Sequence, residues 1–374
     1  MTFATSGRLR RADLGLAFLA LVIVNGGVFM ALTPAARQYT PLVDPFMALS
    51  LYYVLLNASL ARTRHLIVTG AIALGVVEAV IALSQSFFGR PFFAAITPRQ
   101  FVSDRNYLAY LLPGISRSVV QGTGTFGHFN LLGAFLTIAT CLAFGKWLGT
   151  RQRRYLLAFL VIAGGVWVTY SRGSLLGTLG GCLIVYVLCA PHSRRALVAL
   201  GTSAAIVLIV LGGSFLVTYY HDTQHVTERF ATWSYAAGYI EQHPSDLVLG
   251  TGFSFFQHIL LVDQGGQSPV LTAMHSGPLQ ILFELGVFGF LLYLGALAVP
   301  ILRTLRRPRD ATSAAIVGAL AGVLFSATFD NSTFAFSGVL MFGLVALLQR
   351  GLIEERKAAR QAVDGSRFSQ MGAD

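Results

Sequence analysis

The chain has 374 residues, of which 55% are apolar, 12% aromatic and only 11% charged, and its formal net charge is +11. Soluble domains carry about 25% charged residues, so this composition excludes an ordinary soluble protein and indicates an integral membrane protein built from helices. A basic chain can also bind nucleic acid, but the positions of the basic residues argue against that use here.

The apolar residues gather in ten segments, each expected to form a membrane-spanning helix of an all-α, polytopic protein. The segments cover residues 12–32, 42–60, 66–88, 128–147, 155–171, 174–190, 197–217, 276–300, 311–329 and 335–348. The first segment resembles a signal peptide, but it is longer than the usual ~7–15 apolar residues, so a retained helix is predicted. The membrane domain is therefore expected to cover residues 1–348, followed by a charged and partly disordered tail at 349–374.

The basic residues predict how these helices are inserted. With the N-terminus in the cytoplasm, the inner segments hold 20 of the 27 basic residues and the outer segments hold 7. Cytoplasmic loops are enriched in Lys and Arg, so both termini are predicted to be cytoplasmic. The positive charge is then a topology signal, and no nucleic-acid partner is expected.

Two long segments, 89–127 and 218–275, are predicted on the outer face. Loops of this length between spans are more often functional than idle. The second contains a predicted surface helix over 226–242, which is ended by Pro244 and by Gly250-Thr251-Gly252. Its apolar stripe at helical spacing consists of Phe230, Trp233, Ala237 and Ile240.

Small residues predict close packing of two spanning helices through a repeated spacing of four. These residues are Gly173, Gly177 and Gly181 in one span and Gly318 and Gly322 in another. The three cysteines also fall inside predicted spans, where they are expected to fill space rather than bind a metal or form disulfides. They are Cys141, Cys182 and Cys189.

Two arginines on the predicted outer face are candidates for binding an anion. Ser171-Arg172-Gly173 leaves no room for a loop between two spans, so Arg172 is expected at the outer membrane boundary. An interfacial arginine can simply extend to the headgroups. The positive-inside rule disfavours it on this side, however, and a diphosphate is a suitable partner because guanidinium binds phosphate bidentately. Arg229 has an ordinary alternative in an ion pair with Glu228 or a cation–π contact with Trp233.

His275 is a candidate for acid–base chemistry because it directly precedes a predicted helix start at the outer face. Ser276 is a suitable N-cap, and an imidazole at this position can act as a general base or contact a phosphate. Asp330 lies in a short outer turn at 329–333, where it either caps the turn, orients His275 or holds an acceptor hydroxyl.

Two carboxylates fall inside predicted spans, where a charge is costly unless it is paired or protonated. Glu284 follows His275 by nine residues, or about 13 Å along a continuous helix. It is therefore interpreted as a buried polar tie between helices, too deep to meet a substrate at the surface. Glu78 is either a similar tie or part of a proton path. His221 and His225 are spaced for zinc but lack a third ligand, so no metal site is predicted.

The order and sidedness of these motifs resemble the O-antigen ligase and polymerase family, bacterial inner-membrane glycosyltransferases of the C type. The resemblance covers most of the chain from the fourth span onward, and its last motif is the most specific. The motifs are Gly124-Thr125-Phe126-Gly127-His128-Phe129-Asn130, Tyr170-Ser171-Arg172-Gly173, Glu228-Arg229 with Trp233 and Pro244 before Gly250-x-Gly252, and His275-Ser276 followed by Gly286-x-x-Gly289.

The resemblance implies transfer of a glycan from an undecaprenyl diphosphate carrier to an acceptor hydroxyl on the periplasmic side of the inner membrane. It implies that Arg172 and Arg229 hold the diphosphate and that His275 assists the acceptor's attack, while Asp330 matches an acidic residue more loosely. The remaining expected substrate contacts are His128, Asn130, Trp233 and Ser276. Neither a cofactor nor a metal is expected, and attack opposite the leaving group would invert the anomeric centre.

Several functions remain open at this point. A ligase that joins polysaccharide to lipid A core is preferred over a polymerase that extends the glycan on its own carrier, because only one outer loop is very long and few outer residues are basic. A protein O-oligosaccharyltransferase is a further option. A non-catalytic transporter of lipid-linked glycans is the alternative of a different class, but it would be expected to line its interior with polar residues and broken helices. Membrane lipids are expected partners in each case.

Overall fold

The computed structural model describes residues 13–32, 42–89, 102–103, 119–190, 223–253, 276–306, 310–328 and 336–371. Nearly all of these residues are helical, as predicted, and a two-residue antiparallel pair is the one strand pairing within the described ranges. The elements are α1 (Leu14–Leu32), α2 (Val43–Asn57), α3 (Leu60–Phe88), β1 (Val102–Ser103), β2 (Val119–Val120), α5 (Phe129–Thr150), α6 (Arg153–Val168), α7 (Arg172–Cys189), α9 (Thr223–Gln242), α10 (Pro244–Leu249), α12 (Gly277–Leu305), α13 (Ala311–Ala327) and α14 (Phe336–Met371).

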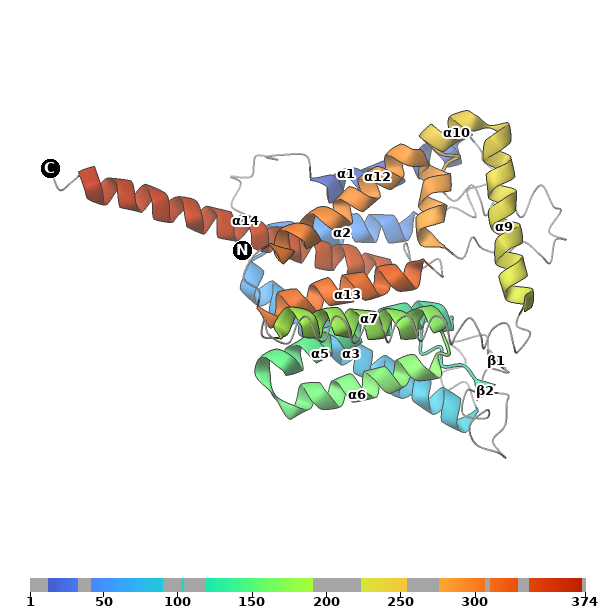
Figure 1. Cartoon of the computed structure of the whole chain (residues 1–374), viewed down its shortest axis with the longest axis horizontal. Helices are drawn as coiled ribbons and strands as arrows, with labels where there is room; N and C mark the ends of the chain where they lie inside the picture. Colours follow the sequence, from blue (N-terminus) through green and yellow to red (C-terminus); the bar gives the residue numbers. More distant parts are fainter. Residues whose placement is uncertain are drawn as a thin grey trace.

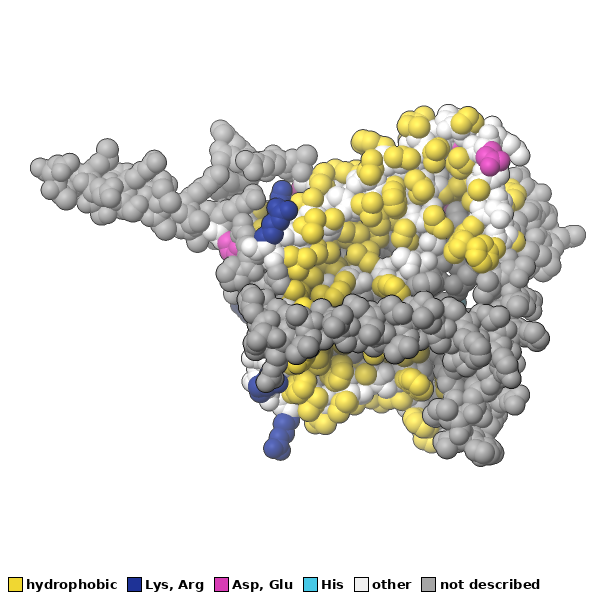
Figure 2. Space-filling view, in the orientation of Figure 1, with side chains coloured by type: hydrophobic (Ala, Val, Ile, Leu, Met, Phe, Trp, Pro, Cys, Tyr) yellow, Lys and Arg dark blue, Asp and Glu magenta, His cyan; other side chains and the backbone are white. Residues whose placement is uncertain are grey.

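The helices have the length and composition of a membrane protein. Within the described ranges, six helices are long and apolar enough to cross a bilayer, namely α1, α3, α5, α7, α12 and α14, and α2 and α13 are shorter apolar helices. The predicted span at 197–217 lies outside the described residues, so the count of ten stays a prediction. Figure 2 shows apolar side chains across the middle of the visible face and Lys and Arg side chains toward one end.

The helices of the bundle form two layers that can be followed in Figure 1. The first layer contains α1, α2, α12 and α14, which contact one another, and the second contains α3, α5, α6, α7 and α13. Helix α14 lies where the layers meet, because it also contacts α3, α5 and α13. Members of each layer come from both halves of the sequence, so neither layer is a separate domain.

The predicted glycine contact forms the centre of the second layer. A Cβ added to Gly177 would meet the carbonyl oxygen of Gly322, and one added to Gly181 would lie 2.6 Å from the carbonyl oxygen of Gly318. The backbones of α7 and α13 therefore touch directly, which only glycine permits at these positions. Cys141 is buried at the neighbouring α5 surface, in agreement with the space-filling role predicted for it, whereas Cys182 is only partly buried and Cys189 is exposed.

One end of the bundle collects the basic residues, as the sidedness argument expects. Arg64 near the start of α3 forms an ion pair of 2.7 Å with Asp310, the N-cap of α13. Arg350 of α14 donates to the Leu56 carbonyl oxygen at the end of α2. We call this the inner end, and the opposite end, where α5 and α7 begin, the outer end. Which end faces the cytoplasm stays a prediction.

Two expectations about helix extent are wrong. The tail predicted as partly disordered from residue 349 is helical to Met371, and α14 projects away from the bundle (Figure 1). The span predicted at 276–300 is also not one continuous helix. Gly286 interrupts α12 with φ 67° and ψ −176°, and Figure 1 shows the first part of α12 turned sharply from the rest.

Candidate functional site

The interruption of α12 lays its first part across the outer end of the bundle. Residues 277–285, here called the half-helix, run across the ends of the spanning helices, as α9 does (Figure 1). The predicted depth of Glu284, about 13 Å below His275, assumed an unbroken helix and is therefore wrong. Because the half-helix does not descend along the bundle, Glu284 stays at the outer end, on the same short segment as Ser276.

The surface helix α9 is present and packs against the half-helix. Buried Ala236 contacts Phe283, and the rings of Tyr239 and Phe283 lie 5.7 Å apart. The predicted apolar stripe is only partly right, because Phe230 is 59% exposed and Ala237 is also exposed. The buried face is rotated toward Ala236 because this face of α9 packs on Phe283 of the half-helix.

The break in α12 is held by the segment Gly250–Phe253, which we call the clamp loop. The backbone N–H of Thr251 donates to the Phe283 carbonyl oxygen at 3.1 Å, and that of Gly252 donates to the Glu284 carbonyl oxygen at 3.0 Å. These carbonyls lose their helical partners where the helix stops, so the clamp loop satisfies them. The predicted Gly-Thr-Gly breaker therefore ends one helix and also caps another.

A partly buried amide on α1 holds the clamp loop from the other side. The side-chain oxygen of Asn25 accepts from the backbone N–H of Phe253 at 2.6 Å. The Phe253 ring is 2% exposed, and it lies against Gly26. The N-terminal helix thus takes part in fixing the position of the half-helix.

The half-helix carries a polar stripe on one side. Ser276, Gln280 and Glu284 are spaced by four residues, so they share a helix face, and they are only 4%, 7% and 1% exposed. The Gln280 side-chain nitrogen donates to a Glu284 carboxylate oxygen at 3.0 Å. Ser276 is the N-cap as predicted, although its side chain makes no capping hydrogen bond within the described part of the chain.

A second polar arrangement fixes the loop that precedes α5. Glu78 of α3 accepts from the Thr125 N–H at 2.8 Å and from its hydroxyl at 2.6 Å. Gln85, two turns along α3, accepts from the Thr123 and Gly124 N–H groups and donates to the Gly124 carbonyl oxygen. Glu78 therefore forms a structural hydrogen-bonded link, as one of its two interpretations predicted. The link joins helix α3 to a loop rather than to another helix.

His128 and Asn130 begin α5 beside this loop. His128 is the N-cap, and its Nδ1 accepts from the backbone N–H of Asn130 at 3.2 Å. In the neutral ring this leaves the proton on Nε2. The His128 ring also stacks on Phe129 with centroids 4.6 Å apart. The structure thus gives His128 a capping role, and its predicted contact with substrate stays a prediction.

Arg172 is the first residue of α7, at the tight turn that the sequence predicts. Tyr170 adopts a left-handed conformation with φ 53°, and the Ser171 side chain caps α7 by accepting from the Ser174 N–H. The Thr169 hydroxyl donates to the Val166 carbonyl oxygen and accepts from the Ser171 N–H at 3.2 Å. Arg172 itself is partly exposed. The turn therefore fixes the Arg172 backbone at the outer end.

The first turns of α5 and α7 lie side by side. A Cβ added to Gly133 would meet the Ser174 side chain, and the Thr137 hydroxyl lies 3.2 Å from the Ser174 carbonyl oxygen. The Ser174 hydroxyl is also 3.2 Å from that of Ser326, near the end of α13. Two helix N-termini, each with partial positive charge, thus adjoin at the outer end next to Arg172.

Several predicted site residues cannot be placed. His275 and Asp330 lie outside the described residues, and Arg229 is in α9 but its side chain is not described. Trp233 is partly buried on α9, where it makes an edge contact with Phe230 at 5.5 Å. The described candidates Arg172, His128, Asn130 and Ser276 all lie at the outer end.

Sequence reasoning did not single out three residues that build this end, namely Asn25, Gln85 and Gln280. Each carries an amide inside a predicted spanning segment, which is the signal that could have revealed it, because an amide removed from water needs hydrogen-bond partners.

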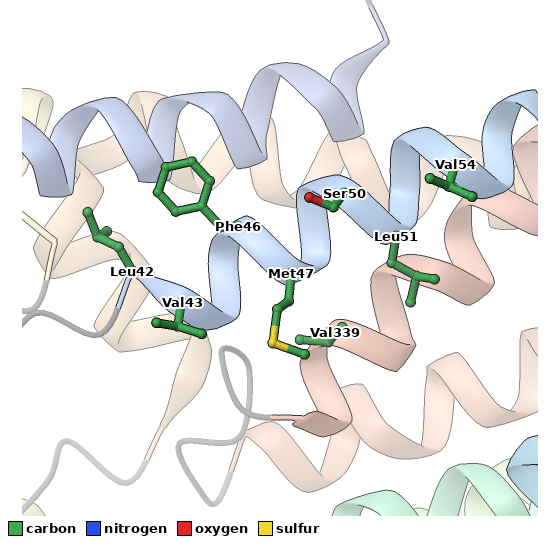
Figure 3. Close-up of a pocket in the computed structure, with 8 residues that line it drawn as sticks. All are labelled: Leu42, Val43, Phe46, Met47, Ser50, Leu51, Val54 and Val339. Atoms are coloured by element: carbon green, nitrogen blue, oxygen red, sulfur yellow. The ribbon is translucent and has the colours of Figure 1, made fainter.

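An apolar groove runs along the first layer between α2 and α14 (Figure 3). Its volume is about 850 Å³. The lining consists of Leu42, Val43, Phe46, Met47, Ser50, Leu51, Val54 and Val339. Leu42, at the outer end of α2, lies against Gly26, as does Phe253 of the clamp loop. One end of the groove therefore adjoins the outer end of the bundle.

One family model matches part of the chain. Residues 157–294 match a family model described as O-antigen ligase. A solved structure described as "Structural coordination of polymerization and crosslinking by a peptidoglycan synthase complex" is similar with a TM-score of 0.47 and 18% identity, over 90% of this chain and 96% of that chain. No curated protein matches the chain. The family match spans α7, α9, α10, the half-helix and the break at Gly286.

Proposed function

We propose, on the premise that residues 157–294 match the O-antigen ligase family, that this membrane protein transfers a glycan from an undecaprenyl diphosphate carrier to an acceptor hydroxyl. The reaction takes place at the outer end, which faces the periplasm of a bacterial inner membrane. The donor matches that location, because nucleotide sugars are confined to the cytoplasm whereas a lipid-linked donor can be presented on the outer side.

The observation that carries the proposal is the gathering of the family's motif positions at one end of the bundle. Arg172 begins α7 beside the first turn of α5, and Ser276 begins the half-helix that lies across the same end. His275 directly precedes Ser276 in the chain. Arg172 and Ser276 therefore begin helices at the same end of the bundle, which supports a shared site for Arg172 and His275.

The chemistry follows from the charge that develops during transfer. As the sugar leaves the diphosphate, negative charge grows on the leaving group, and fixed guanidinium groups near low-dielectric lipid stabilise it. Arg172 and Arg229 have this role, assisted by the positive ends of α5 and α7. His275 accepts the proton of the attacking hydroxyl. Attack opposite the diphosphate inverts the anomeric centre, and no metal takes part.

The groove between α2 and α14 supports a donor with a long apolar chain. Seven of its eight lining residues are apolar, and its end at Leu42 adjoins the clamp loop. An isoprenoid tail lying there would remain at the depth of the hydrocarbon layer while its diphosphate reaches the outer end.

Joining the glycan to lipid A core is the preferred reaction, and extension of the glycan on its own carrier is the second candidate. The two differ only in the acceptor. Deleting the gene separates them, because a ligase mutant accumulates long lipid-linked chains, whereas a polymerase mutant leaves single repeats attached to the surface.

The test of the proposal is substitution of Arg172 and His275 in the full-length protein. Arg172→Ala and His275→Ala are expected to abolish surface glycan attachment without lowering the amount of protein in the membrane. Arg172→Lys is expected to retain little glycan transfer, because Lys cannot bind a phosphate bidentately. Arg153→Ala at the inner end is the control, and it should transfer normally. Normal transfer by both Arg172→Ala and His275→Ala would refute the proposal.

A further inference from the structure

The polar stripe of the half-helix contains a buried hydrogen-bond acceptor that no described residue satisfies. Gln280 is 7% exposed, and its side-chain oxygen Oε1 has no hydrogen-bond partner among the residues that the structure describes. Buried side-chain oxygens without a partner are uncommon, and each one is costly. Such an atom in a folded protein indicates a strained position, a trapped water or a ligand group that the protein is built to receive.

The orientation of this amide is fixed by its neighbour. The Nε2 group of Gln280 donates a hydrogen bond to a Glu284 carboxylate oxygen at 3.0 Å. With the amide in this orientation, its nitrogen faces Glu284 and its oxygen Oε1 faces away from the carboxylate. Glu284 is itself 1% exposed, and its backbone carbonyl is held by the clamp loop. The protein therefore presents Oε1 as an acceptor of fixed orientation.

The position of the acceptor relates it to the proposed site. Gln280 is one turn after Ser276 on the same helix face, about 6 Å along the half-helix. His275 is the residue before Ser276. The group that Oε1 would receive is a donor, and a sugar hydroxyl is the donor that an acceptor substrate brings to this place.

We propose that Gln280 binds a hydroxyl group of the acceptor sugar through Oε1, and that Glu284 is a positioning residue that fixes the Gln280 amide. The inference rests on the proposed function and deepens it by assigning the acceptor side of the site to the half-helix. Arg172 at the start of α7 and Arg229 in α9 hold the donor, whereas Gln280 binds the acceptor.

The test measures transfer by purified full-length protein with donor and acceptor varied separately. The donor is the organic-solvent extract of membranes from the gene-deleted strain. The acceptor is glycan-free lipopolysaccharide or, where this yields no product, the lipid-linked donor itself. Gln280→Met keeps the side-chain volume and removes the amide. We expect it to lower kcat/KM for the acceptor by about 5- to 100-fold while leaving the KM for the donor unchanged. Leu279→Met on the exposed side of the half-helix is the control.

The role of Glu284 is tested by combining substitutions. Glu284→Met should lower kcat/KM for the acceptor, and the Gln280→Met/Glu284→Met double variant should lose no more than Gln280→Met alone. Glu284→Gln retains an oxygen that can accept from Nε2, so it should restore most of the transfer. Independent, additive losses would overturn the positioning role.

Three outcomes would overturn the assignment of Gln280. The first is an unchanged kcat/KM for the acceptor in Gln280→Met, which is expected if a trapped water satisfies Oε1. The second is an equal loss of kcat/KM for the donor and for the acceptor. The third is full transfer by Gln280→Asn, whose shorter side chain withdraws the amide by one methylene. If Gln280→Met fails to fold, the Gln280→Asn variant tests the assignment in its place. If the wild-type protein shows no transfer, the proposed function is refuted. If Arg172→Ala loses transfer while Gln280→Met transfers normally, the proposed function stands and only this inference is refuted.

Discussion

Gly286 is the position at which a single methyl group should change the outer end most. Its φ of 67° and ψ of −176° belong to a region that is essentially restricted to glycine. A Cβ at this position would also meet the backbone where α10 ends and the clamp loop begins, with the Val248 carbonyl carbon at 2.5 Å and the Gly250 nitrogen at 2.6 Å. Backbone atoms cannot rotate away as a side chain can, so Gly286→Ala must distort either the break or the clamp loop.

The cost can be worked out from these two routes. Holding alanine in this conformation costs about 1–3 kcal/mol. Moving the clamp loop away sacrifices the two hydrogen bonds from Thr251 and Gly252, at about 0.5–1.5 kcal/mol each. If both effects contribute, Gly286→Ala destabilises the protein by about 2–6 kcal/mol. A straightened α12 would also carry Ser276 away from the outer end, and a misplacement of only ~1 Å can lower a rate about 100-fold.

The assay compares thermal unfolding in detergent and glycan transfer for Gly286→Ala and Gly238→Ala. Gly238 lies in α9, where an added Cβ would meet nothing within 4 Å, so its substitution should be neutral or slightly stabilising. Gly286→Ala should unfold at a clearly lower temperature and transfer at least about 100-fold more slowly. Equal unfolding temperatures and equal rates for the two variants would refute the account of the break.

Three further substitutions test other contacts. Glu78→Gln replaces one acceptor oxygen by a donor and should destabilise the protein by about 1–3 kcal/mol, measured as lower thermal stability and faster proteolysis of the outer loop. Gly177→Ala should cost about 1–3 kcal/mol because it separates two helix backbones, whereas Gly180→Ala, whose Cβ meets open space, should not. Burial raises the pKa of Asp310, but the hydrogen bond and charge of Arg64 outweigh this and hold it below its ordinary 3.8. The ion pair is therefore expected to stabilise the protein above pH 3.8 and to be lost as pH falls through the lower folded pKa. Asp310→Asn should remove that dependence at a cost of about 1 kcal/mol near neutral pH, since Asp310 is 56% exposed and solvent screens the pair; an unchanged acid profile would contradict this.

The spanning helices were predictable because a long apolar run has few alternatives to a membrane helix. Turn chemistry was also readable, since Ser171-Arg172-Gly173 allows only a tight connection and the family motif places an arginine there. The glycine spacing correctly indicated direct backbone contact between helices. In each case the controlling interaction is local or repeats at helical spacing, so the pattern is visible in the sequence.

The half-helix was missed because hydropathy does not distinguish a bent helix from a straight one. Gly286 and the clamp loop are far apart in sequence, and the break depends on hydrogen bonds that join them. The depth assigned to Glu284 was wrong for this reason. Gln280 was overlooked because its significance depends on which groups surround its amide, and a sequence alone does not show those neighbours.

The two-layer arrangement bears on how the donor and acceptor sides communicate. Arg172 begins a helix of the second layer, whereas the half-helix continues into α12 of the first layer. Each side is held by contacts within its own layer. The α7–α13 glycine contacts hold the helix that carries Arg172, and Asn25 with the clamp loop holds the half-helix. A small slide of one layer against the other would therefore change the separation of Arg172 and Gln280 while leaving the contacts on each side intact.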